Sequence, residues 1–186
     1  MSNLIILVVG LPGSGKTFAG DIIKKRFNAH VVETGDVIRE EIERRGWKYT
    51  PETDRRMREW FHSGREYIVV KRVLDKLSET KKKVRVVVGF RCLKELGVLK
   101  RLFKGKIIVI SIIASFKIRA QREQKRKRFG KSETLSYLRK RDMAEKKIGL
   151  HHLLKKADYR INNTDLTKKQ MEAKIVKLVN RIIKQI

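Results

Sequence analysis

Residues 4–17 read LIILVVGLPGSGKT, an apolar run followed at once by a glycine-rich loop that ends in lysine and threonine. The loop completes the pattern G-x-x-x-x-G-K-[ST], in which loop N–H groups cradle phosphates, the lysine reaches the β- and γ-phosphates, and the threonine hydroxyl ligates Mg²⁺. A glycine-rich strand-to-helix turn with an accidental lysine is the weaker alternative. We therefore expect a strand at 4–9, a helix from residue 15, and a nucleoside triphosphate held between them. The residues expected against the triphosphate are Gly10, Leu11, Pro12, Gly13, Ser14, Gly15, Lys16 and Thr17, with Mg²⁺ on Thr17.

The composition indicates one soluble domain with an unusual charge. The chain has 186 residues, which suits a single domain over 1–186, and the apolar run at 107–113 is far shorter than the roughly 20 residues that span a bilayer. The N-terminus shows no secretory pattern, and one cysteine, Cys92, excludes an internal disulfide. We therefore expect a cytoplasmic protein without a membrane partner. The net charge of +27 favours phosphates, nucleotides or RNA as partners, and a strongly solvated surface with no specific partner fits it equally well.

Strands and helices alternate along the whole sequence. Strands are expected at 4–9, 30–33, 84–89, 107–113 and 159–162, and helices at 15–27, 36–45, 52–80, 93–103 and 117–128, the last running on towards 154. A final amphipathic helix places Met171, Ile175, Leu178, Ile182 and Ile186 on one stripe. The central strands are continuous β-branched runs, which is typical of a parallel sheet covered on both faces. This order predicts an α/β fold: a three-layer α/β/α P-loop NTPase with a five-stranded parallel sheet and a helical lid.

Four further motifs follow the phosphate loop in order: ETGDVIREE at 33–41, GFR at 89–91, RD at 141–142 and ADYRINN at 157–163. Together they resemble a small archaeal family of P-loop kinase-like proteins related to adenylate kinase and dephospho-CoA kinase, and the resemblance covers nearly the whole chain. It implies transfer of the γ-phosphate of ATP to a nucleotide or nucleotide-like acceptor. It also implies an acceptor-side helical region at about 36–80, with Thr34 lining the acceptor pocket. Arg39 and Arg91 would grip the acceptor phosphate, because a guanidinium forks two oxygens as lysine does not.

A basic arm, KIRAQREQKRKRFGK at 117–131, holds eight Lys or Arg residues and one Glu. The resemblance implies a lid at about 117–150 that closes over the donor phosphates, with Arg122 and Arg126 facing them and Arg141 just beyond. Such arginines stabilise the charge of a transferring phosphoryl group. One active site cannot use all eight, so the remainder either lie in solvent or follow an RNA backbone. Asn162 and Asn163 are weaker candidates for the donor base, since they also read as a turn and helix cap.

One position departs from the family pattern. Val88 stands where the family has an aspartate that holds Mg²⁺ or its waters, and residues 83–90 contain no acid. Among the acids of these motifs, Asp36 is best placed to take over as base or second-sphere ligand, although capping a helix that starts at Val37 explains it equally well. The catalytic residues expected are then Lys16, Asp36, Arg122, Arg126 and Arg141. We favour an ATP-dependent small-molecule kinase, against a nucleotide-gated RNA-binding or ribosome-assembly ATPase and a pseudokinase that binds ATP without transferring phosphate.

Overall fold

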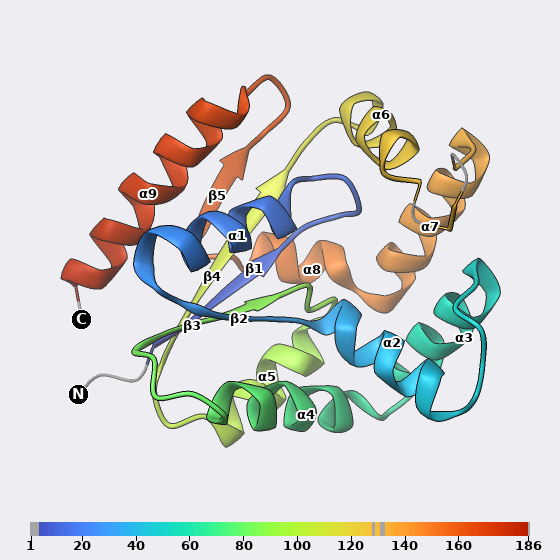
Figure 1. Ribbon diagram of the computed structural model, residues 1–186, viewed down its shortest axis with the longest axis horizontal. Coiled ribbons are helices and arrows are strands. Elements are labelled where there is room, and N and C mark those ends of the chain that lie inside the picture. The colour runs from blue at the N-terminus through green and yellow to red at the C-terminus, as the bar shows by residue number, and fades with distance from the viewer. Residues whose placement is uncertain (1–3, 128, 131–132, 186) are drawn as a thin grey trace.

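The computed structural model describes residues 4–127, 129–130 and 133–185. Its centre is one parallel sheet with the strand order β2-β3-β1-β4-β5 (Figure 1). The strands are β1 (Leu4–Val9), β2 (His30–Glu33), β3 (Val84–Val88), β4 (Lys106–Ile113) and β5 (Tyr159–Asn162). The five strands and the three-layer α/β fold expected from the sequence are confirmed, with bounds that differ by at most one residue.

Helices cover both faces of the sheet (Figure 1). On one face lie α1 (Lys16–Phe27) and α9 (Lys168–Lys184). The other side holds α2 (Thr34–Arg44), α3 (Pro51–Phe61), α4 (Glu66–Ser78), α5 (Leu93–Leu102) and α8 (Leu150–Lys155). Two helices, α6 (Phe116–Arg126) and α7 (Leu135–Ile148), follow β4 and lie beyond the carboxyl ends of the strands (Figure 1). In the described part of the chain, no helix has both the length and the hydropathy that crossing a membrane requires.

The central strand explains why the sequence lacks an alternating pattern. Every residue of β1 is buried, because successive side chains point to opposite faces and both faces are covered. Ile6 packs in the cluster formed with α1 and α9, whereas Leu7 packs with α2, α3, α4 and α5. The two clusters fix β1 in the middle of the sheet and so place the loop that follows it.

The long helices expected from the sequence are interrupted. The helix expected at 52–80 is two helices, since the chain turns after Phe61: His62 Nδ1 donates to the Arg58 carbonyl at 2.6 Å, and Gly64 has φ +87°. The helix expected from 117 towards 154 is three. Thr134 caps the start of α7 by accepting the N–H of Tyr137 at 3.1 Å, and a left-handed glycine at 149 separates α7 from α8.

Parts of two expectations fall outside the described residues. In the basic arm these are Arg128 and Lys131, and in the final stripe Ile186. Within α9 the buried stripe includes Val179, whereas Leu178 is only partly buried.

Candidate active site

The phosphate loop connects β1 to α1 through a tight turn. The Ser14 N–H donates to the Leu11 carbonyl at 3.1 Å. Gly15 has φ +99°, and a Cβ there would come within 2.5 Å of Asn163 Nδ2. At Gly10 the backbone passes so close to β4 that a Cβ would lie 2.5 Å from the Ile112 carbonyl oxygen. Glycine is therefore required at both positions for different reasons, and the loop has the compact shape that presents N–H groups to a phosphate.

Side chains from α6 and from the residue that follows β5 hold this loop by its carbonyl groups. Asn163 Nδ2 donates to the Ser14 carbonyl at 2.8 Å. Arg122 donates to the Gly13 carbonyl at 3.3 Å and to the Asn163 carbonyl at 3.0 Å. The structure thus places Arg122 against the loop backbone, where no phosphate is needed to explain its position. Asn162 accepts hydrogen bonds from the N–H and hydroxyl of Thr164 and so forms the turn that the sequence left open, whereas Thr167 caps α9.

A second arginine secures the same loop. Arg119 donates to the Pro12 carbonyl at 3.2 Å and forms a two-pronged ion pair with Asp142 at 2.9 and 2.6 Å. Because α6 and α7 are thereby tied to each other and to the loop, part of the basic arm serves to shape the site.

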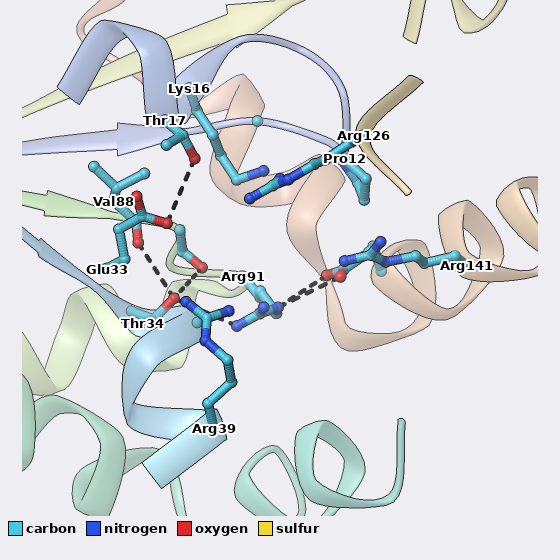
Figure 2. Close-up of a pocket in the computed structure, with 14 residues that line it drawn as sticks. Pro12, Lys16, Thr17, Glu33, Thr34, Arg39, Val88, Arg91, Arg126 and Arg141 are labelled. Atoms are coloured by element: carbon cyan, nitrogen blue, oxygen red, sulfur yellow. Dashed lines mark hydrogen bonds and ion pairs between the residues drawn. The ribbon is translucent and has the colours of Figure 1, made fainter. Parts of the chain in front are cut away.

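In front of the loop lies a pocket that encloses about 520 Å³ of empty space, part of it open to solvent. Lys16 and Arg126 point into it from one side and Arg39 and Arg91 from the other, with Arg141 alongside (Figure 2). The residues that line it are Gly10, Pro12, Lys16, Thr17, Glu33, Thr34, Gly35, Arg39, Val88, Gly89, Arg91, Arg126, Arg141 and Glu145. Five cationic side chains against two carboxylates make this a pocket for anions.

Lys16 is the cation nearest the loop. Its amine donates to the Leu11 carbonyl at 3.4 Å. Burial, and secondarily the charge of Arg141, lowers the pKa of Lys16 to about 8, against the opposing effect of Glu145 and Glu123. A bound phosphate would reverse this shift, since an adjacent anion favours the protonated amine.

The opposite wall is built where α2 begins and β3 ends. The fully buried Thr34 donates its hydroxyl to the Gly89 carbonyl at 2.9 Å, and Arg91 Nη1 lies 3.5 Å from the same hydroxyl. Arg39 lines the pocket and is ion-paired with Asp36. The Thr34 hydroxyl therefore joins the two segments that carry Arg39 and Arg91.

Asp36 is not the helix cap that one interpretation of the sequence expected, and its role as base or second-sphere ligand stays a prediction. The helix begins at Thr34, so Asp36 lies in its first turn and does not cap it; Glu33 is the N-cap residue. The Asp36 carboxylate is half-exposed and bonded to Arg39. Its contact in the structure is that of a counterion.

Glu145 on α7 is a site residue that the sequence did not reveal. Its carboxylate is buried and lies 3.3 Å from Arg91 and 3.5 Å from Arg58. Burial alone would raise its pKa, but Arg91, Arg58 and Arg141 together lower it to about 2. No local pattern signals this residue, because its ion-pair partners Arg58 and Arg91 come from two other segments.

Glu33 is the second residue that the sequence did not reveal. It is the last residue of β2, pairs in register with Val88 of β3, and accepts the Thr17 hydroxyl at 3.5 Å (Figure 2). A hydroxyl and a carboxylate beside the phosphate loop are oxygen donors that suit Mg²⁺, which usually keeps several waters. The donor set therefore fits the metal that the sequence motif implies. An acid at the carboxyl end of a strand close to the loop was the available signal.

Comparison with known proteins extends over the whole chain. The AAA domain family matches residues 9–139. A UPF0200 protein of Hyperthermus butylicus is 33% identical over 98% of this chain and 97% of its own length, and one of Pyrobaculum aerophilum is 36% identical over 94% and 96%.

Solved structures share the fold at low identity. Shikimate kinase from Acinetobacter baumannii, in complex with shikimate, superposes with a TM-score of 0.59 at 18% identity, over 95% of this chain and 93% of its own. A gluconokinase from Sinorhizobium meliloti 1021 gives 0.59 at 16% identity, over 97% and 95%. At such identities the likeness concerns the fold alone.

Proposed function

Because the chain belongs to the UPF0200 family and carries an AAA domain with a P-loop kinase-like fold, we propose that it transfers the γ-phosphate of ATP to a small phosphorylated acceptor, a nucleotide or nucleotide-like molecule. The archaeal, P-loop kinase-like family expected from the sequence is confirmed. The closer relationship to adenylate kinase and dephospho-CoA kinase stays a prediction, as does the division into an acceptor-side region and a lid.

One observation carries this proposal: a single pocket has two cationic walls. Lys16 and the loop form the first wall, and Arg39 and Arg91 form the second across the same space (Figure 2). A protein that only hydrolyses a triphosphate needs the first wall alone. The second wall supports a second anionic substrate, held with its phosphate facing the donor.

The donor would lie along the loop. Its β- and γ-phosphates accept hydrogen bonds from the loop N–H groups and from Lys16, while Arg126 and Arg141 face the group in transfer. Thr17 would hold Mg²⁺, which when bound offsets the charge of the phosphates. Arg122 positions the loop through its carbonyl groups and needs no contact with substrate.

The acceptor phosphate would bind between Arg39 and Arg91. To do so it displaces Asp36 from Arg39 and competes with Glu145 for Arg91. In both cases the phosphate replaces a carboxylate as the anion beside the arginine. An acceptor oxygen then attacks the γ-phosphorus, the bond from that phosphorus to the bridging oxygen breaks, and ADP leaves.

The chemistry of the second wall favours a phosphate, and not an alcohol, as the attacking group. A phosphate is ionised at neutral pH, since its second pKa is about 6, and so it needs no general base. Of the two carboxylates that line the pocket, Glu145 is surrounded by arginines and Glu33 faces Thr17 on the donor side. A hydroxyl acceptor would require a base that this wall lacks among the residues lining the pocket.

The contacts of the basic arm favour this function over RNA binding. Arg119 pairs with Asp142, Arg122 binds the loop, and Arg126 lies 3.8 Å from Glu123 while lining the pocket. These three arginines are engaged within the protein, so RNA binding stays a prediction from charge alone.

The test is an acceptor screen. ADP formation is measured with nucleoside monophosphates and dephospho-CoA as acceptors. We expect nucleoside monophosphates, which offer a phosphate oxygen, to stimulate turnover more than dephospho-CoA, which offers a hydroxyl. Lys16→Ala should abolish turnover, and Arg91→Gln should remove the stimulation while ATP affinity changes less than about threefold. Arg101→Gln, an exposed arginine on α5, is the matched control and should change nothing. If no acceptor raises turnover above the ATPase rate without acceptor, or if only RNA does, the proposal is wrong.

A further inference from the structure

The carboxyl end of β3 presents no acid to the phosphate loop. Val88 and Gly89 line the pocket there, and the Val88 side chain is buried in the cluster formed with α1. A Cβ on Gly20 of α1 would lie 2.9 Å from Val88 Cγ2, so position 88 faces the first turns of that helix.

The neighbouring strand presents an acid to the same place. Glu33 and Val88 are register partners in parallel strands, so their side chains project to the same face. Two residues earlier on β2, Val31 also faces Gly20. Glu33 continues along that face and reaches Thr17, one turn before Gly20 on α1, with 3.5 Å between the hydroxyl and carboxylate oxygens. Because β2 lies one strand farther from β1 than β3 does, a side chain on β2 must extend farther to reach the phosphate loop. Glutamate is one methylene longer than aspartate and so has the longer reach.

The other carboxylates near the pocket are committed elsewhere. Glu145 lies between Arg58 and Arg91, and Asp36 is ion-paired with Arg39. The side chain of Glu33 instead accepts the hydroxyl of Thr17, which the motif assigns to the metal. Glu33 is therefore the carboxylate placed to act on the donor side of the pocket.

We infer that Glu33 is the metal-positioning carboxylate of this protein, supplied from β2 in place of an acid at position 88. It would accept hydrogen bonds from the waters of the Mg²⁺ that accompanies the donor triphosphate, with Thr17 as the protein ligand. The inference rests on the proposed binding of Mg²⁺ and ATP, but not on which acceptor is used. If so, the valine at position 88 does not imply that the protein has lost phosphoryl transfer.

The test measures the gain in ATP affinity that Mg²⁺ provides. Titration calorimetry with ATP, in Mg²⁺ and in EDTA, gives the ratio of the two affinities for each variant without requiring turnover. In Glu33→Gln the ratio should fall about tenfold or more, as for other outer-sphere ligands. Affinity in EDTA should be unchanged or tighter, because a negative charge beside the triphosphate has been removed. Glu40→Gln, an exposed glutamate on α2, is the matched control and should retain the ratio.

Two further variants test whether the position of the carboxylate matters, apart from any effect on folding. In Glu33→Gln/Val88→Asp the carboxylate moves one strand nearer to β1 on the same face, and the Mg²⁺ gain should return. If the buried aspartate prevents folding, Glu33→Asp serves instead: it keeps the charge, shortens the reach, and should lose most of the gain. Retention of the full Mg²⁺ gain in Glu33→Gln would overturn the inference. Loss of the gain together with a failed acceptor screen would overturn only the proposed transfer.

Discussion

Removing the charge of Glu145 should destabilise the protein at neutral pH by an amount that its pKa sets. In the fold this carboxyl has a pKa of about 2 because Arg91, Arg58 and Arg141 outweigh its burial, against 4.5 for the free side chain. A lowering of the pKa by this amount corresponds to about 3 kcal/mol of folding stability. Glu145→Gln keeps the shape of the side chain and loses this contribution, which for a chain of this length lowers Tm by about 6–12 °C.

The pH dependence of this loss follows from the direction of the pKa shift. A carboxyl with a lowered pKa stabilises the fold above the pKa of the unfolded chain, and the stabilisation disappears as the pH falls through the folded pKa. The difference between wild type and Glu145→Gln should therefore be fully present at pH 7, shrink to roughly half near pH 3, and vanish below pH 2.

Urea unfolding of the two proteins at pH 7, 5, 4 and 3 measures this difference directly. Glu43→Gln, on the exposed surface of α2, is the control and should stay within about 0.5 kcal/mol of wild type. Inorganic phosphate should stabilise Glu145→Gln more than wild type, because an anion then replaces the missing carboxylate beside Arg91. A difference below about 1 kcal/mol at pH 7, or one that does not depend on pH, would refute the reasoning.

Three further predictions concern single groups. Arg122→Met should weaken ATP binding about tenfold in equilibrium titrations and leave the preference among acceptors unchanged, because Arg122 holds the Gly13 and Ser14 carbonyls and not a substrate. When ATP binds at pH 8, Lys16 should take up about 0.5 proton from the buffer, because its pKa of about 8 rises beside phosphate; titrations in buffers of different ionisation enthalpy measure this uptake. Cys92 should resist iodoacetamide at pH 8 until urea unfolds the chain, as mass spectrometry would show, because burial and Glu95 raise its pKa to about 12.

Most of the fold was predictable from the sequence because it depends on local signals. Continuous β-branched runs marked the central strands, and the phosphate loop fixed the order of β1 and α1. The helix breaks were missed because they depend on weak cues, such as the turn at 62–65 with Gly64 and the left-handed Gly149. These glycines lie inside otherwise helical patterns, which tolerate a single glycine.

The site was predictable where a motif carried it and not where tertiary packing did. Lys16, Arg39, Arg91, Arg126 and Arg141 do lie around one pocket, although their roles stay predictions. Motif order placed Arg122, Asp36 and Asn162 near the ligands, but the contacts of their side chains were not predicted: Arg122 donates to the Asn163 carbonyl, Asp36 pairs with Arg39, and Asn162 accepts from Thr164. Glu145 forms ion pairs with arginines from other segments, and no sequence pattern predicts such long-range contacts.

The central claim is that one pocket holds two anions at once, and a crystal structure with a non-hydrolysable ATP analogue, Mg²⁺ and inorganic phosphate tests it most directly. We predict the triphosphate against Lys16 and the loop, and a separate phosphate between Arg39 and Arg91, with Arg39 released from Asp36. A structure with the triphosphate in place, Arg39 still bonded to Asp36 and no second anion at Arg91 would contradict the account.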